Sequence, residues 1–104
     1  AYDSGNGVVA AFRFGADGAT SPLWRRAMNH AAHPIRFPGT GELVLCDHDS
    51  ERNADQLVVV DIETGDELAR ADTGSPIQSV LFGAAGFERD VYYCSFTTVA
   101  RLSC

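Results

Sequence analysis

The chain has 104 residues, of which 45% are hydrophobic, and its formal net charge at pH 7 is -6. This length allows one small domain. The acidic balance, with no basic stripe, argues against nucleic acid and anionic membrane surfaces as partners. Every apolar run is shorter than the roughly 20 residues that a membrane-spanning helix needs. The sequence does not begin with methionine, so we expect a processed or excised piece of a longer chain.

Short runs of β-branched or alternating residues, separated by turn residues, predict an all-β chain. The expected strands are 7–14, 22–28, 35–37, 42–46, 56–63, 67–72, 77–82, 91–96 and 99–102. Between them we expect polar loops at 29–34 and 47–55 and glycine-rich turns at 15–18, 38–41 and 83–86. No stretch combines a helical apolar period with caps at both ends, so helix is expected only in occasional turns.

Three cysteines, Cys46, Cys94 and Cys104, stand at spacings that match no metal motif. Their odd number and the lack of a C-x-x-C pair predict reduced thiols and argue against a structural zinc site. Cys46 and Cys94 occupy equivalent strand positions, too far apart to bridge, and are expected to act as small buried apolar side chains. Reduced thiols favour a reducing compartment, and therefore the cytoplasm.

An internal repeat organises the expected strands. Matching segments recur at offsets of 42 to 50 residues: Val8-Val9 with Val58-Val59, Trp24–Ala27 with Leu68–Ala71, Pro34-Ile35 with Pro76-Ile77, and Leu45-Cys46 with Tyr93-Cys94. A period of roughly 40–50 residues is typical of the four-stranded blades of β-propellers. With strands lettered A to D outward from the propeller axis, the chain reads C-D, A-B-C-D, A-B-C.

The segment 58–65 (VVVDIETG), followed by 73–76 (TGSP) and a strand ending in Phe82, resembles the YVTN-type repeat of bacterial seven-bladed β-propellers, within the WD40-like and PQQ-like group. Segments 33–37 and 42–45 fit the same repeat, although the name-giving tetrapeptide is replaced by 44–47 (VLCD) and 92–95 (YYCS). The resemblance implies a partial propeller of antiparallel four-stranded blades, with blade parts at 7–28, 34–72 and 77–102. Propellers of this kind include lactonases, surface proteins, electron-transfer domains and binding scaffolds, so the fold does not fix the chemistry.

In a four-stranded blade, the loop from strand D to the next strand A emerges on the same face as the loop from strand B to strand C. The 29–34 loop is of the first kind and the 47–55 loop of the second, so both are expected on one face. The tentative ligand-binding residues gathered there are His30, His33, Asp47, His48, Asp49 and Asn53, with His30, His33 and His48 as tentative metal ligands. Histidine with carboxylate is the composition of a transition-metal or general-base site. The alternative is a solvated polar loop without a ligand. Calcium is not expected, because Arg52 stands where a calcium loop needs its turn glycine.

Two functional hypotheses follow. The first is a non-enzymatic binding or scaffold segment, and the alternative is a lactonase-like or metal-dependent propeller hydrolase. The sequence has no G-x-S-x-G or G-x-G-x-x-G motif, so nucleophilic catalysis has no support and no cofactor is expected. The terminal segments 8–12 and 91–93 are apolar on both strand faces, which predicts self-association or completion by the remaining blades of a parent chain. A protein or small molecule could occupy the loop face. Four aromatic residues are expected between blades: Trp24, Phe37, Phe82 and Tyr92.

Overall fold

The computed structural model describes residues 1–3, 7–29, 32–49, 51–77 and 81–104. These residues form ten β-strands and no helix, which confirms the all-β prediction. The strands are β1 (Tyr2–Asp3), β2 (Val8–Phe14), β3 (Thr20–Ala27), β4 (Ala32–Arg36), β5 (Glu42–Asp49), β6 (Ala54–Asp61), β7 (Glu67–Asp72), β8 (Phe82–Ala84), β9 (Phe87–Cys94) and β10 (Val99–Ser103). With strands alone, this part of the chain contains no helix that could cross a membrane.

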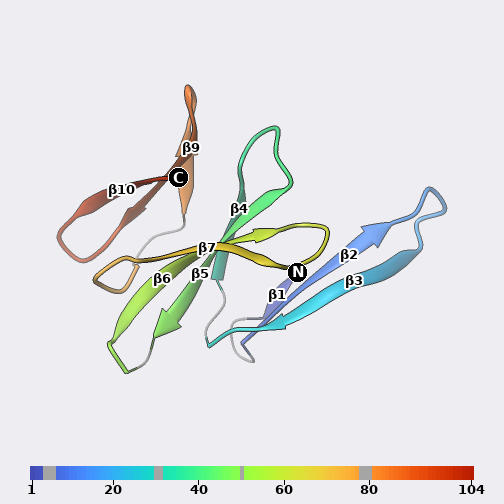
Figure 1. Ribbon diagram of the computed structural model, residues 1–104, viewed down its shortest axis with the longest axis horizontal. Helices are drawn as coiled ribbons and strands as arrows, with labels where there is room; N and C mark the ends of the chain where they lie inside the picture. Colours follow the sequence, from blue (N-terminus) through green and yellow to red (C-terminus); the bar gives the residue numbers. More distant parts are fainter. Residues whose placement is uncertain (4–6, 30–31, 50, 78–80) are drawn as a thin grey trace.

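The strands form three antiparallel sheets, each built from strands that follow one another in the chain. We call them the first sheet (β1-β2-β3), the middle sheet (β4-β5-β6-β7) and the last sheet (β8-β9-β10). Figure 1 shows them in sequence, from the blue first sheet through the green and yellow middle sheet to the orange and red last sheet. The molecule measures 47 × 34 × 20 Å along its principal axes.

The two central strands of the middle sheet, β5 and β6, are buried on both faces. On one face Leu45, Val58 and Val60 form a core with Val9 and Met28 of the first-sheet region. The opposite face contributes Val44, Cys46, Leu57 and Val59 to a second core, together with Val91 and Tyr93 of the last sheet. The continuous apolar run 57–60 explains this arrangement, because successive side chains point to opposite sides of a strand.

Two expected loops are shorter than predicted. The 47–55 segment was expected to be a polar loop, but β5 runs to Asp49 and β6 starts at Ala54, and their ladder includes His48 opposite Asp55. Cross-strand backbone hydrogen bonds outweigh the polar composition there. Similarly, β4 begins at Ala32, inside the expected 29–34 loop, and its register with β5 shifts between Ala32 and Ile35. The irregularity accommodates a proline, which has no N–H to donate to a ladder.

The prediction of a strand at 77–82 is wrong at Ile77 and Leu81, whereas Phe82 is the first residue of β8, and residues 78–80 lie outside the described part. Ile77 and Leu81 are not in strands, and their side chains join the core between the middle and last sheets. The hairpin instead forms later, with Ala84 opposite Phe87 and a turn that contains Gly86 at φ 82°. At Ile77 and Leu81, apolar packing was therefore mistaken for strand pairing.

The aromatic predictions hold for two of the four residues. Phe37 is buried in the core and Trp24 packs against the core between the first and middle sheets. Phe82 is instead 41% exposed, and its ring stacks on that of Tyr92 with centroids 5.7 Å apart.

The ladder register also corrects the repeat alignment by one residue. Val9 lies opposite Arg26 in the first sheet, whereas the equivalent Val59 lies opposite Ala69. Arg26 therefore matches Ala69, and Arg70 points to the opposite side of its sheet, because a shift of one residue reverses every side chain.

Candidate functional site

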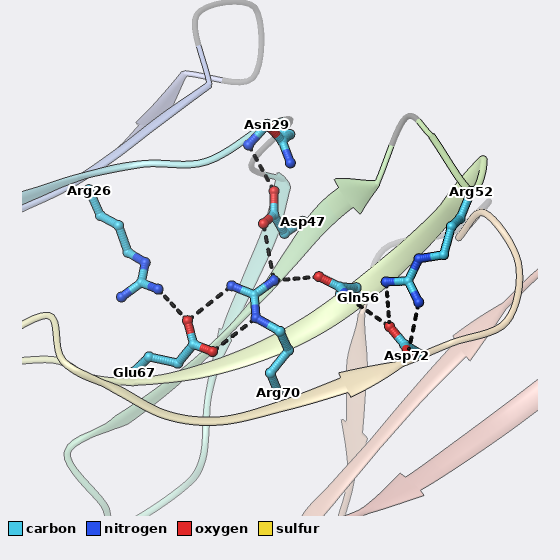
Figure 2. A network of polar contacts seen from close by, with 8 residues as sticks. All are labelled: Arg26, Asn29, Asp47, Arg52, Gln56, Glu67, Arg70 and Asp72. Atoms are coloured by element: carbon cyan, nitrogen blue, oxygen red, sulfur yellow. Dashed lines mark hydrogen bonds and ion pairs between the residues drawn. The ribbon is translucent and has the colours of Figure 1, made fainter.

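The most extensive polar arrangement lies on the face of the middle sheet that meets the first sheet. Figure 2 shows it as a network of polar contacts. The apolar core of Leu45, Val58 and Val60 lies on the same face of the sheet. Its members come from β3, β5, β6, β7 and the two connections beside them: Arg26, Asn29, Asp47, Arg52, Gln56, Glu67, Arg70 and Asp72.

Asp47 is the buried carboxylate of this network, with 6% of its surface exposed. Its Oδ1 accepts a hydrogen bond from the backbone N–H of Asn29 at 2.9 Å, and its Oδ2 lies 3.3 Å from Nη1 of Arg70. The first contact attaches the end of the first sheet to β5. A carboxylate removed from water needs such charged or N–H partners, so the position of Asp47 depends on both neighbours.

Arg70 on β7 is the centre of the network (Figure 2). Its Nε and Nη2 donate to the two carboxylate oxygens of Glu67 at 2.9 and 3.0 Å, and Nη1 also donates to Oε1 of Gln56 at 2.5 Å. The hydrogen bond from Arg70 lowers the pKa of Glu67, and that from Glu67 raises the pKa of Arg70. Two parallel N–H···O bonds fix the plane of the guanidinium group and give this pair its geometric specificity.

The network extends in two directions from Arg70. Towards solvent, Gln56 Nε2 donates to Asp72 at 2.6 Å, and Arg52 reaches the same carboxylate with contacts of 3.0 and 3.1 Å. Towards the first sheet, Arg26 pairs with Glu67, and its Nη1 donates to the carbonyl oxygen of Gly65 at 3.2 Å. The contacts from Arg26 join β3 to β7 across the sheet interface.

A second polar cluster occupies the opposite face of the middle sheet, around Asp55. Nδ1 of His48 lies 2.7 Å from Oδ1 of Asp55, and Oδ2 accepts the backbone N–H of Ile77 at 2.5 Å. The backbone carbonyl of Asp55 also accepts the Thr73 hydroxyl at 2.6 Å. The cluster therefore fixes the chain that leaves β7 to the hairpin of β5 and β6. Nearby, burial raises the pKa of the Cys46 thiol to about 12, so that thiol is inert at neutral pH.

The structure separates the tentative site residues that it describes. Asp47 and His48 are neighbours on β5, so their side chains point to opposite faces, one towards Arg70 and the other towards Asp55. Asn53 lies in the turn between β5 and β6, exposed and at φ 48°. His30 lies outside the described residues, and for His33 in β4 and Asp49 in β5 only the backbone is described. Binding of a ligand or metal by these residues stays a prediction.

No motif in the sequence indicates the contacts that join the sheets. Arg26 and Glu67 are 41 residues apart, and Arg13 and Glu63, which also pair between the first and middle sheets, are 50 apart. Arg89 of β9 pairs with Glu42 of β5 on the other side. The only sequence signal was an arginine or glutamate at alternating strand positions, which does not identify the partner.

A groove of about 460 Å³ lies between the first and middle sheets. Apolar side chains line most of it: Val9, Phe12, Leu23, Trp24, Leu43 and Ile62. Its two charged lining residues, Arg13 and Glu63, pair with each other. A groove of this composition offers shape and apolar surface to a ligand.

The network of Figure 2 contains three arginines and three carboxylates, so its charges balance. Among the described residues no side-chain polar atom is both buried and without a hydrogen bond, and no group of three histidine, cysteine or acidic residues is placed to hold a metal ion. Comparison of the chain with models of protein families, with curated proteins and with solved structures finds no match.

Proposed function

We propose that this chain is a non-enzymatic binding or scaffold segment of a β-propeller protein, comparable to the YVTN-type repeats. The observation that carries the proposal is the middle sheet: four consecutive antiparallel strands, of which β5 and β6 are buried on both faces against neighbouring sheets. A sheet that is packed on both sides by successive sheets of the same chain is the arrangement expected of a propeller blade. Under this proposal the first and last sheets are incomplete blades.

The polar clusters support a binding role more than a catalytic one. In both clusters the central carboxylates are engaged by partners that hold sheets or connections together. A general base needs an oxygen or nitrogen within hydrogen-bond reach of a substrate. The described residues present their charges mainly to one another, so the lactonase-like or metal-dependent alternative gains no specific support.

Exposed apolar side chains of the terminal sheets support association. Phe82, Phe87 and Val99 of the last sheet are 41%, 49% and 70% exposed, and Phe14 of the first sheet is 77% exposed. Exposed apolar surface of this kind is usual where a further layer packs. We propose that the chain associates with itself or with further blades of a parent chain.

The test uses untagged protein in three measurements. We expect less than stoichiometric divalent metal by mass spectrometry, no hydrolysis of a panel of γ- and δ-lactones above the buffer blank, and a mass that rises above the monomer in light scattering at micromolar concentration. Stoichiometric metal that is lost in His33→Ala, together with lactone hydrolysis, would establish the enzyme instead. A monomer that unfolds cooperatively would refute the proposal that the first and last sheets are incomplete blades.

A further inference from the structure

We propose that the ring nitrogen Nε2 of His48 is a nucleophile that accepts acyl groups from neutral activated donors, thioesters or aryl esters, and that Asp55 positions it. This activity goes beyond the proposed binding role and does not depend on it. Both residues lie on the central strands of the middle sheet, β5 and β6, far from either end of the sequence.

Asp55 fixes the imidazole of His48 in one tautomer. The two residues lie directly opposite each other in the ladder of β5 and β6, and Nδ1 of His48 is 2.7 Å from Oδ1 of Asp55. An ionised carboxylate only accepts hydrogen bonds, so Nδ1 must carry the ring hydrogen. The lone pair of the neutral ring is therefore on Nε2.

The carboxylate of Asp55 is itself held in place. Only 9% of its side chain is exposed, and its Oδ2 accepts the backbone N–H of Ile77 at 2.5 Å. Its backbone carbonyl accepts the hydroxyl of Thr73 at 2.6 Å. These contacts with the connection after β7 keep Oδ1 directed at His48. A carboxylate fixed in this way orients the ring of a reactive histidine.

The nitrogen Nε2 is open to a reagent. The side chain of His48 is 29% exposed, and because the buried carboxylate covers the Nδ1 side of the ring, the exposed side is the one with Nε2. Among the described residues none forms a hydrogen bond to Nε2. The nearby thiol does not compete, because burial raises the pKa of Cys46 to about 12. The imidazole is therefore the nucleophile that this cluster presents to solvent.

The reaction proceeds through an acyl intermediate. The lone pair of Nε2 forms a bond to the carbonyl carbon of the donor, and the bond from that carbon to sulfur or oxygen breaks, so that a thiolate or phenolate leaves. The ring is then an acylimidazolium, which keeps the hydrogen on Nδ1, and its positive charge is stabilised by the carboxylate of Asp55. Water adds to the acyl carbon and the C–N bond breaks, which gives a carboxylic acid, releases a proton to solvent and restores the neutral imidazole.

Charge and leaving group define the class of donor. The net charge of -6 disfavours anionic donors such as phosphoryl compounds, so a neutral acyl group is favoured. A good leaving group is required, because the intermediate formed from an ordinary lactone would expel the imidazole rather than an alkoxide. Lactone hydrolysis is therefore not expected from this pair, and failure of this proposal differs from failure of the proposed function.

The experiment follows the release of nitrophenolate from para-nitrophenyl acetate by the 104-residue chain in a Cys104→Ser background, which removes an exposed thiol. His48→Gln should lower the second-order rate constant at least about fivefold, because only the other histidines remain as imidazole nucleophiles. Thr73→Val is the matched control: it removes a hydrogen bond to the backbone of Asp55, leaves the carboxylate beside His48, and should retain the rate. Equal rates for His48→Gln and the Cys104→Ser parent would overturn the proposal.

Asp55→Asn tests the tautomer. Because the amide oxygen must accept the N–H of Ile77, the NH2 group would face Nδ1 of His48 and move the ring hydrogen to Nε2. NMR of the ring nitrogens should show the hydrogen on Nδ1 in the parent and on Nε2 in Asp55→Asn, with a rate as low as that of His48→Gln. An unchanged rate, or a loss of rate without the change of tautomer, would overturn the role of Asp55. If Asp55→Asn does not fold, the parent spectrum decides, because a hydrogen on Nε2 there contradicts the assignment.

Discussion

Replacing Gly65 with alanine tests how the first and middle sheets are packed. Gly65 adopts φ 76° in the turn between β6 and β7, and a Cβ built on it would lie 2.6 Å from Cδ2 and 2.8 Å from Cγ of Trp24. The indole cannot move away freely, because its Nε1 donates to the carbonyl oxygen of Ile62 at 2.9 Å. These ring atoms lie near the root of the side chain, so relief of the overlap requires β3 itself to shift.

The expected loss of stability has two parts. A left-handed conformation costs a residue with a Cβ about 1–2 kcal/mol, and overpacking a contact costs about 1–3 kcal/mol. Gly65→Ala should therefore lower the free energy of unfolding by roughly 2–5 kcal/mol. In a domain of this size each kcal/mol corresponds to about 4–8 °C in Tm, so thermal unfolding followed by circular dichroism resolves the effect.

Gly74→Ala is the matched control. Gly74 has φ 72° and no heavy atom within 4 Å of a built Cβ, so the variant should lose only the conformational part, about 1–2 kcal/mol. In a Trp24→Ala background the cost of Gly65→Ala should fall to that same value. Equal destabilisation by Gly65→Ala and Gly74→Ala in the wild-type background would refute the packing of Trp24 on this turn.

Three further predictions concern the polar clusters. Arg70→Ala should lower the free energy of unfolding by about 1–3 kcal/mol, because buried Asp47 loses a charged partner. The control is Arg52→Ala, which removes an exposed ion pair and should cost at most about 1 kcal/mol. Equal losses for the two variants in urea titrations would contradict the role of Arg70 as partner of a buried carboxylate. Burial raises the pKa of Cys46 from 9.0 to about 12, so the stability contributed by the neutral thiol is intact below pH 9 and is lost as pH rises towards 12. Cys46→Ala should flatten this decline of the free energy of unfolding with pH. The same pH dependence in the variant and the wild type, measured by chemical denaturation, would contradict the prediction. Hydrogen bonds from the N–H groups of Thr64 and Glu63 lower the pKa of Asp61, so the turn is stable above about pH 3.8 and weakens as pH falls further. Asp61→Asn should remove this acid dependence from the amide hydrogen exchange of the turn. An acid dependence that persists in the variant would show that another carboxyl causes it.

The local sequence determined the strands of the middle sheet and the turn within it. A strand was predicted at 56–63, and the structure shows β6 at Ala54–Asp61 with a core on each side of its apolar run 57–60. In the turn that follows β6, the carboxylate of Asp61 is in the sequence beside its partners, and its Oδ1 accepts the N–H groups of Glu63 and Thr64 at 2.8 and 2.9 Å. These features depend on neighbours in the chain, so the residues themselves carry the information.

Tertiary structure decided which residues share a face and which sheets meet. Asp47 and His48 were grouped as loop residues, but extension of β5 to Asp49 places their side chains on opposite faces of the sheet. Similarly, Arg26 and Glu67 meet only because β3 lies over β7. Strand register sets the side to which each side chain points, and register depends on partner strands far away in the sequence. Composition and spacing within one segment cannot specify that partner.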